Sequence, residues 1–290
     1  MNYILMILSM FMSVGKALTC KKIGGSSNNF RELMTTNSGV FLVAFLCVLI
    51  TVAGNLKSIF HTSSYSVVLA MIFALVMVFT QVTQSVAMAK GSSSSTVLIY
   101  SCGFLIPVVW SSIVLAEPIT AYQYAGIAIL LVALYLIVSP DKNAVFSAVW
   151  LVFALLSMTG SGVTAIIQKV HQHSDFAHEL RVFLIYTFAF GAIFSFILSQ
   201  LPTGSRKSDG NSRGRLTISI VSGLFVGLLN VLNLMLAGKI PAVILFPVYN
   251  VGGMIITGIA GSIIFKEKNT PKQILGFVIG CVAIGVIGLL

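Results

Sequence analysis

The sequence predicts an all-α integral membrane protein whose ten transmembrane helices form two inverted five-helix repeats. Three observations predict this fold class: the composition, ten apolar runs, and polar positions that recur between the two halves of the chain. Of 290 residues, 57% are hydrophobic and 8% are charged, whereas soluble domains carry about 25% charged residues. Such an apolar chain suits lipid as its solvent, where helices satisfy their own backbone hydrogen bonds.

Ten apolar runs approach the length of about 20 residues that a helix needs to cross a bilayer. Short connections such as Glu117-Pro118 separate most of them, and proline fits there because it cannot continue the preceding helix. Two longer polar stretches, residues 21–37 and 202–215, are expected to be loops. The predicted helices cover residues 2–20, 35–56, 65–89, 93–116, 119–138, 144–168, 179–200, 215–238, 241–265 and 271–290.

Polar landmarks recur when the sequence is shifted by 148 to 150 positions. Gln81 and Gln84 then meet Asn230 and Asn233, and a tyrosine pair matches in the same way. Polar residues are scarce inside apolar runs, so their agreement indicates a repeat, with residues 1–139 and 140–290 as its copies. Five helices is an odd number, so the second copy enters the membrane from the opposite side and the two copies are inverted.

The formal charge is +10, from 17 Lys and Arg against 7 Asp and Glu. The basic residues lie between the apolar runs, which indicates membrane topology and anionic head groups and argues against nucleic acid as a partner. Of the 17, 12 fall in the odd-numbered loops, so the positive-inside rule puts both termini outside the cell. The four cysteines form no CxxC pair and are expected to be buried side chains, without a disulfide framework or a metal site.

Two pairs of amides are the main candidates for substrate binding. Gln81 and Gln84 are three residues apart and share one helical face, as do Asn230 and Asn233 in the other half. An amide in hydrocarbon is costly unless it is paired, so these faces are expected to point into the bundle or into a wet cavity. The alternative role is hydrogen bonding between helices, which amides also provide.

Four further residues complete the candidate binding site. Lys16, near the end of the first helix, could hold an anionic group, or could extend to the membrane surface. Tyr100 and Tyr249 are candidate cavity walls, although tyrosines also gather at membrane interfaces. Asn250 follows Pro247, where the helix either breaks and exposes backbone groups or only kinks.

Several kinds of chemistry have no support in the sequence. All seven acidic residues lie at helix ends or in loops, so neutral, zwitterionic or anionic substrates fit better than cationic ones. The segment from His171 to Glu179 holds three of the four histidines with irregular spacing and is expected to be a solvated loop without a metal. No phosphate-binding GxxxxGK[ST] loop and no nucleophile–base pair occurs, so neither a cofactor nor an enzyme activity is expected.

Two related motifs close the fourth and ninth helices. They are Glu117-Pro-Ile-Thr, followed by Gly126, and Glu267-Lys-Asn-Thr, followed by Gly276, and in each the glycine comes nine residues after the glutamate. With ten helices in two repeats, this pattern resembles the EamA-like, ten-helix branch of the drug/metabolite transporter superfamily. The resemblance implies export or exchange of small metabolites, amino acids, nucleotide-linked compounds or drugs through a central cavity. It also implies cytoplasmic termini, the reverse of the orientation that the charge count predicts.

These observations together predict a secondary transporter of a small polar metabolite that works by alternating access. Its site is expected at mid-depth between the two repeats. The expected partners are the small-molecule substrate and the lipid bilayer, with the chain as a multi-pass protein of the cell membrane and a monomer or homodimer. The alternatives are a membrane scaffold or regulatory protein without transport activity, and a proton-coupled multidrug exporter.

Overall fold

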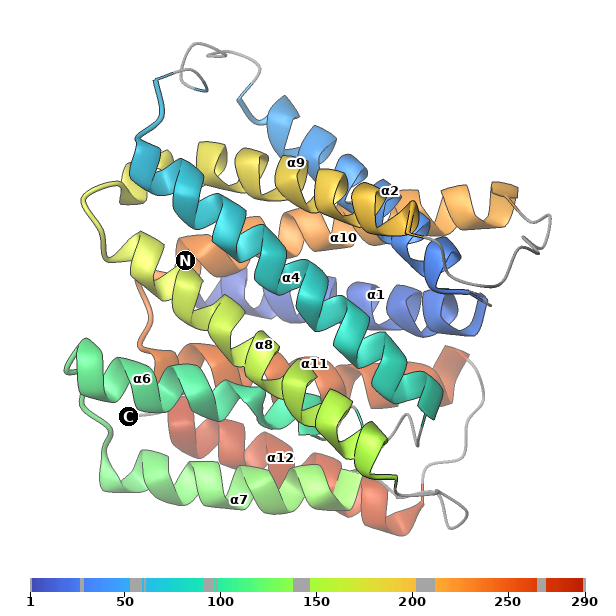
Figure 1. Ribbon diagram of the computed structural model, residues 1–290. Coiled ribbons are helices and arrows are strands. Elements are labelled where there is room, and N and C mark those ends of the chain that lie inside the picture. The colour runs from blue at the N-terminus through green and yellow to red at the C-terminus, as the bar shows by residue number, and fades with distance from the viewer. Residues whose placement is uncertain are drawn as a thin grey trace. The chain divides into compact units, whose positions relative to one another are not determined.

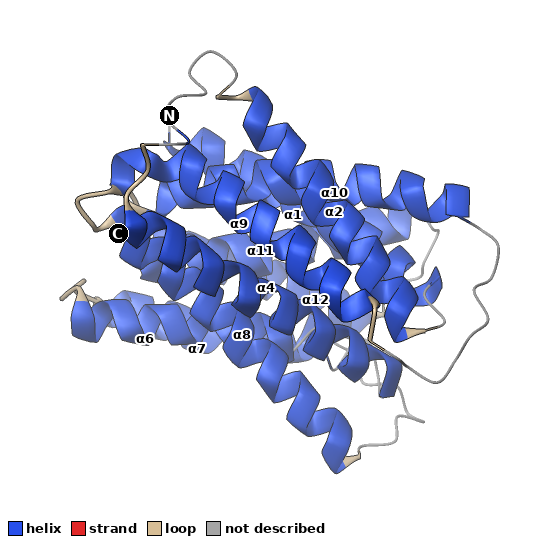
Figure 2. Cartoon of the chain, turned by 45° about the horizontal axis from the view of Figure 1, so that its top comes forward, coloured by secondary structure: helices blue, strands red, loops and turns tan. Residues whose placement is uncertain are grey.

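The computed structural model describes residues 2–26, 29–52, 59, 61–90, 96, 99–137, 147–201, 212–264 and 270–288. All regular secondary structure in these ranges is helical, and Figure 2 draws no strand among them. Of the loop expected at 202–215, residues 202–211 lie outside the described residues and 212–215 are helical, and Glu267 of the second motif also lies outside them.

A helix lies in each of the ten predicted apolar runs. Two short 3-10 turns, η1 and η2, lead directly into α6 and α9. The elements are α1 (Asn2–Ser26), α2 (Phe30–Ile50), α4 (Ser64–Lys90), η1 (Cys102–Phe104), α6 (Leu105–Val114), α7 (Ala121–Ile137), α8 (Ala148–Gln172), η2 (Ala177–Glu179), α9 (Leu180–Ser199), α10 (Ser212–Ala237), α11 (Ala242–Ile264) and α12 (Pro271–Gly288).

Five helical segments of the described chain are long and apolar enough to cross a membrane: α2, α4, α8, η2 with α9, and α10. The apolar segments in the other five runs are shorter, at 10–17 residues each. The all-α prediction is therefore confirmed, and the length and composition of five helices agree with a membrane protein.

Parts of two predicted loops are helical in the structure. Residues 21–37 belong mostly to α1 and α2, and α8 continues four residues past the predicted end, through Lys169 and His171 to Gln172. Hydropathy identifies the apolar part of a helix, whereas its end depends on capping groups and on tertiary contacts. A tertiary contact stabilises the polar first turn of α2, because Glu32 is buried there and accepts a hydrogen bond from Arg215 of α10.

The chain divides into two compact units, and each unit contains segments from both predicted repeats. Unit 1 comprises Met1–Val14, Phe79–Ile166 and Lys239–Leu290, and unit 2 comprises Gly15–Val78 and Ile167–Gly238. Helices α1, α4 and α8 contribute to both units. The predicted division between residues 139 and 140 separates the two sequence repeats and not these two units, and it stays a prediction.

In unit 1, α7 and α12 pack side by side, and α11 packs against α12, α6 and α7 (Figure 1). The α7–α12 contact is close because glycines lie in it. A Cβ atom added to Gly276 of α12 would lie 2.8 Å from the backbone nitrogen of Ile137 and 3.0 Å from the carbonyl oxygen of Ala133, both in α7. At the start of α11, the backbone N–H of Ala242 donates to Glu117 Oε2 over 2.7 Å.

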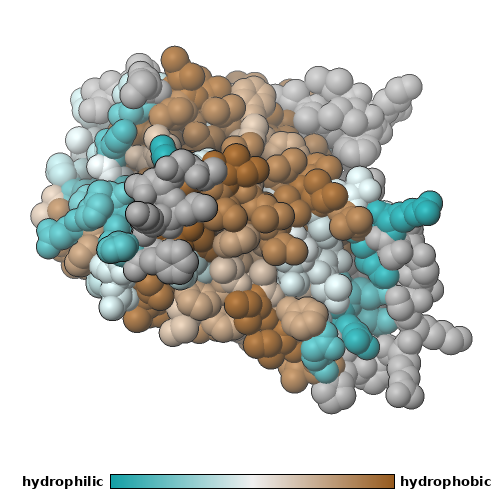
Figure 3. All heavy atoms as spheres, turned by 90° about the horizontal axis from the view of Figure 1, so that it is seen from above, coloured by the Kyte–Doolittle hydropathy of each residue, from teal (hydrophilic) through white to brown (hydrophobic). Residues whose placement is uncertain are grey.

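In unit 2, α2 packs against both α9 and α10. The rings of Phe41 and Phe188 face each other at 6.4 Å between α2 and α9, and Ser38 Oγ donates to the carbonyl oxygen of Ala192 over 3.0 Å. Large apolar side chains on the opposite faces of these helices, such as Leu46, are exposed. Figure 3 shows that many residues on the visible face are hydrophobic. Exposed apolar side chains suit lipid as the surrounding solvent.

Candidate functional site

The candidate binding residues fall in both units. Unit 1 contains the two amides of α4, both tyrosines and the asparagine of α11, and unit 2 contains the lysine of α1 and the two amides of α10. In chain order they are Lys16, Gln81, Gln84, Tyr100, Asn230, Asn233, Tyr249 and Asn250. Their convergence on one chamber stays a prediction.

The two asparagines of α10 are buried, but they differ in their partners. Asn230 accepts a hydrogen bond at Oδ1 from Gln168 Nε2 of α8 over 3.2 Å, and its Nδ2 donates to the carbonyl oxygen of Val226 over 2.9 Å. Asn233 is 6% exposed, and within the described part of the chain its Oδ1 accepts no hydrogen bond. A buried carbonyl oxygen of this kind favours a ligand or water that donates a hydrogen bond.

The two glutamines of α4 are half-buried. Among the described residues, nothing donates to the buried Oε1 of Gln81. Thr83 lies between them in sequence, and its hydroxyl donates to two carbonyl oxygens of its own helix, those of Phe79 and Thr80. The threonine is therefore satisfied locally, whereas the glutamine oxygen retains the capacity to accept a hydrogen bond.

The aromatic and asparagine candidates of unit 1 are half-buried. Asn250 Nδ2 donates to the carbonyl oxygen of Phe246 over 3.0 Å, one turn earlier in α11. The helix runs without a break through Pro247, so of the two alternatives at this proline the broken helix is excluded. Gly253, which follows, lies against Ser13 of α1, where a side chain larger than hydrogen would overlap it.

Lys16 is half-buried in α1, and it begins the last three turns of that helix. Its carbonyl oxygen accepts a hydrogen bond from the hydroxyl of Thr19, three residues later in the same helix, over 2.9 Å. Lys16 contributes a positive charge to unit 2, where the two asparagines of α10 also lie.

Sequence reasoning missed the polar end of α8. Lys169 is 1% exposed and His171 is 0% exposed, although His171 was expected in a solvated loop and Lys169 lies past the predicted end of the helix. The prediction was wrong because the polar run Gln168-Lys169-Val-His171-Gln172 resembles a loop in hydropathy, whereas in the structure partners from other helices surround it. The available signal was the helical spacing, since Gln168, His171 and Gln172 recur at three and four residues.

We call His171, Gln172, Ser63, Ser66 and Glu179 the His171 cluster. His171 Nδ1 lies 3.0 Å from Gln172 Nε2, and His171 Nε2 lies 3.4 Å from Ser66 Oγ at the start of α4. Glu179 of η2 accepts hydrogen bonds from the backbone N–H of Ser63, over 2.9 Å, and from its hydroxyl, over 2.6 Å. The cluster therefore links the ends of α8 and η2 to the first turn of α4.

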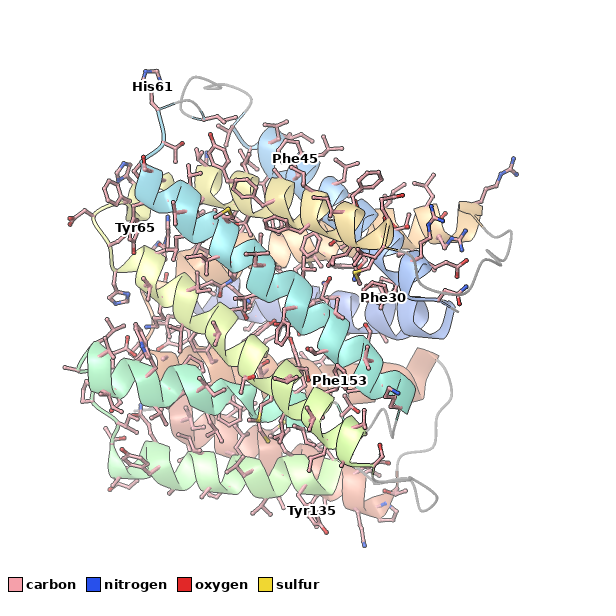
Figure 4. The ribbon with its side chains drawn as sticks, in the orientation of Figure 1. Phe30, Phe45, His61, Tyr65, Tyr135 and Phe153 are labelled. Atoms are coloured by element: carbon pink, nitrogen blue, oxygen red, sulfur yellow. The ribbon has the colours of Figure 1, made fainter. Side chains whose placement is uncertain are left out.

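Aromatic rings border this cluster. The His171 ring stacks on Phe183 of α9 with 4.1 Å between centroids. Tyr65, next to Ser66, lies beside the turn that follows α8 (Figure 4), and its ring stacks on Phe176 at 5.4 Å. In the described ranges, no three His, Cys, Asp or Glu side chains are close enough to hold a metal ion. The cluster contains hydrogen-bonding groups and an imidazole, a side chain that can bind a proton.

No known protein family and no curated protein matches the chain. Twenty-eight chains of solved structures match it. One, described only as "Crystal structure of protein", has a TM-score of 0.81 at 11% sequence identity, and the match covers 99% of this chain and 96% of that one. At this identity the similarity establishes the fold alone. Fold and site together therefore define a helical protein with five helices apolar and long enough to cross a membrane.

Proposed function

We propose that the chain is a secondary transporter that exports or exchanges a small polar metabolite by alternating access. In this proposal it is a multi-pass protein of the cell membrane with ten spans, and residues 1–139 and 140–290 form inverted repeats around a central site. It acts as a transporter of the EamA-like type, without a cofactor and without an enzyme activity. Alternating access requires two inverted halves that move about a site at mid-depth.

The helix boundaries support a repeat. Helices α7 and α12 begin at Ala121 and Pro271, which are 150 positions apart. This interval agrees with the shift that aligns the polar landmarks of the sequence. The position of a helix depends on many residues besides the few polar ones that align, so this agreement is a separate argument for the repeat.

Reciprocal contacts in unit 1 are the observation that carries the proposal. A Cβ atom on Gly126 of α7 would meet Ile287 of α12, and one on Gly276 of α12 would meet Ile137 of α7. Gly276 lies 150 positions after Gly126, and Ile287 lies 150 positions after Ile137. The two contacts therefore join equivalent positions of the predicted repeats, with the two helices exchanged. Such exchange is the signature of two-fold symmetric packing, in which residue i contacts j and j contacts i.

The same reciprocity holds elsewhere in unit 1. A Cβ atom on Gly103 would meet Ser161 of α8, and one on Gly253 would meet Ser13 of α1. Gly103 and Gly253 are 150 positions apart, and Ser13 and Ser161 are 148 apart. Since these glycines lie on different helices from the α7–α12 pair, the two sets of contacts are independent.

Unit 2 contains a matching pair of carboxylates. Glu32, in the first turn of α2, binds Arg215 near the start of α10, and Glu179, directly before α9, binds Ser63 directly before α4. Each carboxylate thus lies at the start of the second helix of one predicted repeat and contacts the start of the third helix of the other. A two-fold relation between the repeats would account for both contacts.

The buried amide oxygens indicate what the transporter would bind. As far as the structure describes their surroundings, Gln81 Oε1 and Asn233 Oδ1 lack a donor. Each belongs to one of the paired amide motifs, and each would be satisfied by a hydroxyl, amine or amide group of a solute. These oxygens favour a small polar metabolite over an apolar drug, because an apolar ligand would leave them unsatisfied.

Counterflow in proteoliposomes tests the proposal. Purified protein is reconstituted, and vesicles are loaded with amino acids, carboxylic acids or nucleosides in turn, with the labelled solute outside. We expect exchange of at least one solute, and a loss of about tenfold or more when Gln81→Ala and Asn233→Ala are combined, since each removes a hydrogen bond from a buried site. The exposed amide of Gln200 provides the matched control, Gln200→Ala, which should retain the wild-type rate.

Two results would contradict the proposal. Exchange that is unchanged in the Gln81→Ala, Asn233→Ala double variant would refute the site. A well-folded wild-type protein that exchanges none of the solutes would refute transport and favour the scaffold or regulatory role.

A further inference from the structure

Three buried amides of unit 2 lie on α8 and α10, and they differ in how their hydrogen bonds are used. Gln168 of α8 donates to Asn230 of α10, and Asn233 follows Asn230 by three residues. Residues three apart on a helix are neighbours on its surface, so the two asparagines lie close together. Within the described chain, Asn233 Oδ1 nevertheless accepts no hydrogen bond, although its neighbour carries amide N–H groups.

A backbone group fixes the orientation of the Asn230 amide. Its Nδ2 donates to the carbonyl oxygen of Val226 over 2.9 Å, and a carbonyl oxygen can only accept. If the amide turned over, Asn230 Oδ1 would face that carbonyl oxygen and the two acceptors would repel each other. Asn230 Oδ1 therefore points to α8, and Gln168 must present its N–H group to it, as it does over 3.2 Å.

Asn230 is thus held at both ends of its amide and does not satisfy its neighbour. To donate to Asn233 Oδ1, it would have to turn away from Val226 and Gln168 and lose both hydrogen bonds. A buried acceptor without a donor costs stability. An arrangement that keeps such an acceptor open therefore favours a bound ligand that supplies the donor.

The charges of unit 2 favour an uncharged donor over an ammonium group. Lys169 follows Gln168 in α8 and is buried, and Lys16 of α1 is half-buried. The carboxylates of Glu32, in the first turn of α2, and of Glu179, directly before α9, already accept hydrogen bonds from other groups. A further cation near a buried lysine is repelled more strongly than in water, because the dielectric constant is lower there.

We propose that the solute is neutral or anionic and donates a hydroxyl O–H to Asn233 Oδ1, and that Gln168 is the positioning residue that keeps this acceptor open by holding Asn230. The inference rests on the proposed function, because it names the chemistry of the solute at the proposed site. It separates hydroxyl compounds from amines, which the proposed function leaves together.

The test uses solutes that share one carbon skeleton. Propionate, 3-hydroxypropionate, L-alanine and L-serine combine the absence or presence of a hydroxyl group with the absence or presence of an ammonium group, and adenosine is added as a larger hydroxyl compound. Counterflow in proteoliposomes gives a KM for each solute that exchanges. We expect the hydroxyl member of each pair to have a KM about tenfold lower than its partner, since it gains one hydrogen bond to a buried acceptor.

Two variants test the roles of the amides. Asn233→Leu removes the acceptor, and Gln168→Met removes the donor that holds Asn230, which can then turn to Asn233. Each should raise the KM of the hydroxyl solute about tenfold and remove its advantage over the partner without a hydroxyl. A purely structural role of either residue would leave that advantage unchanged. The control is Gln200→Leu, an exposed amide, which should keep the wild-type preference.

Elution and melting show whether each variant folds, and if Gln168→Met does not, Asn233→Leu decides. The inference is overturned by wild-type exchange that is confined to solutes without a hydroxyl group, or by a folded Asn233→Leu protein that keeps the hydroxyl preference. A folded Gln168→Met protein with the wild-type preference overturns the positioning role. These results leave the proposed function standing, whereas wild-type protein that exchanges no solute refutes the proposed function and this inference with it.

Discussion

The α7–α12 contact offers the sharpest test of the packing. In Gly276→Ala, the new methyl group would lie 2.8 Å from the backbone nitrogen of Ile137 and 3.0 Å from the carbonyl oxygen of Ala133. Both obstacles are backbone atoms, which cannot rotate away, so the two helices must separate. Overpacking of this kind costs about 1–3 kcal/mol. At about 2–4 °C per kcal/mol, the melting temperature should fall by about 2–12 °C.

Gly285→Ala is the matched control on the same helix, because a Cβ atom there would meet nothing within 4 Å. Alanine is the better helix former by about 1 kcal/mol, so this variant should melt at or above the wild-type temperature. Gly126→Ala should fall between the two, since its tightest contact is Ile287 Cγ1, the movable part of a side chain. The assay is thermal unfolding of purified protein in detergent. Equal melting of the Gly276→Ala and Gly285→Ala proteins would refute the packing, and with it the reciprocal contacts that carry the proposed repeat.

Two further predictions concern single residues. Ala116, after α6, has a φ of 52°, a backbone conformation that glycine adopts more easily than alanine, so Ala116→Gly should raise the free energy of unfolding by about 1 kcal/mol. The control, Ala128→Gly on the exposed face of α7, should lower it by about the same amount. Equal shifts in the melting temperatures of the two variants would contradict the strained backbone at Ala116. Arg215→Ala removes an ion-pair partner of the buried Glu32 carboxylate and should cost about 2 kcal/mol, against almost nothing for Arg213→Ala, since Arg213 is exposed. Adding Glu32→Gln to Arg215→Ala should recover part of that loss, and a double variant less stable than Arg215→Ala would argue against the ion pair.

The positions of the candidate binding amides were only partly predictable. Their scarcity in apolar runs correctly indicated that Asn230 and Asn233 would be buried. Which of them has a partner was not predictable, because the donor to Asn230 is Gln168, 62 positions earlier on another helix. In the sequence, Gln168 is a polar residue at the end of an apolar run, and nothing near it in the chain indicates that it donates a hydrogen bond to Asn230.

The ends of the helices were the least predictable part of the fold. Residues 21–37 and 169–172 are polar, and polar residues in a mostly apolar chain resemble loops. In the structure these segments are largely helical, and Glu32 and His171 within them are buried. Their partners, Arg215 and Ser66, lie more than a hundred residues away in the chain. No local pattern records such a pairing.

The amino-acid sequence alone determined that the chain is helical and where its apolar helices lie, because hydropathy and helix formation act over a few turns of local sequence. It also contained the spacing at which helices and polar residues recur. Only the tertiary structure decided which glycines meet backbone atoms, which carboxylates bind across helices, and that Lys169 and His171 are buried. These features arise from side chains distant in sequence that packing brings into contact, and burial changes both the energy and the chemistry of a polar group.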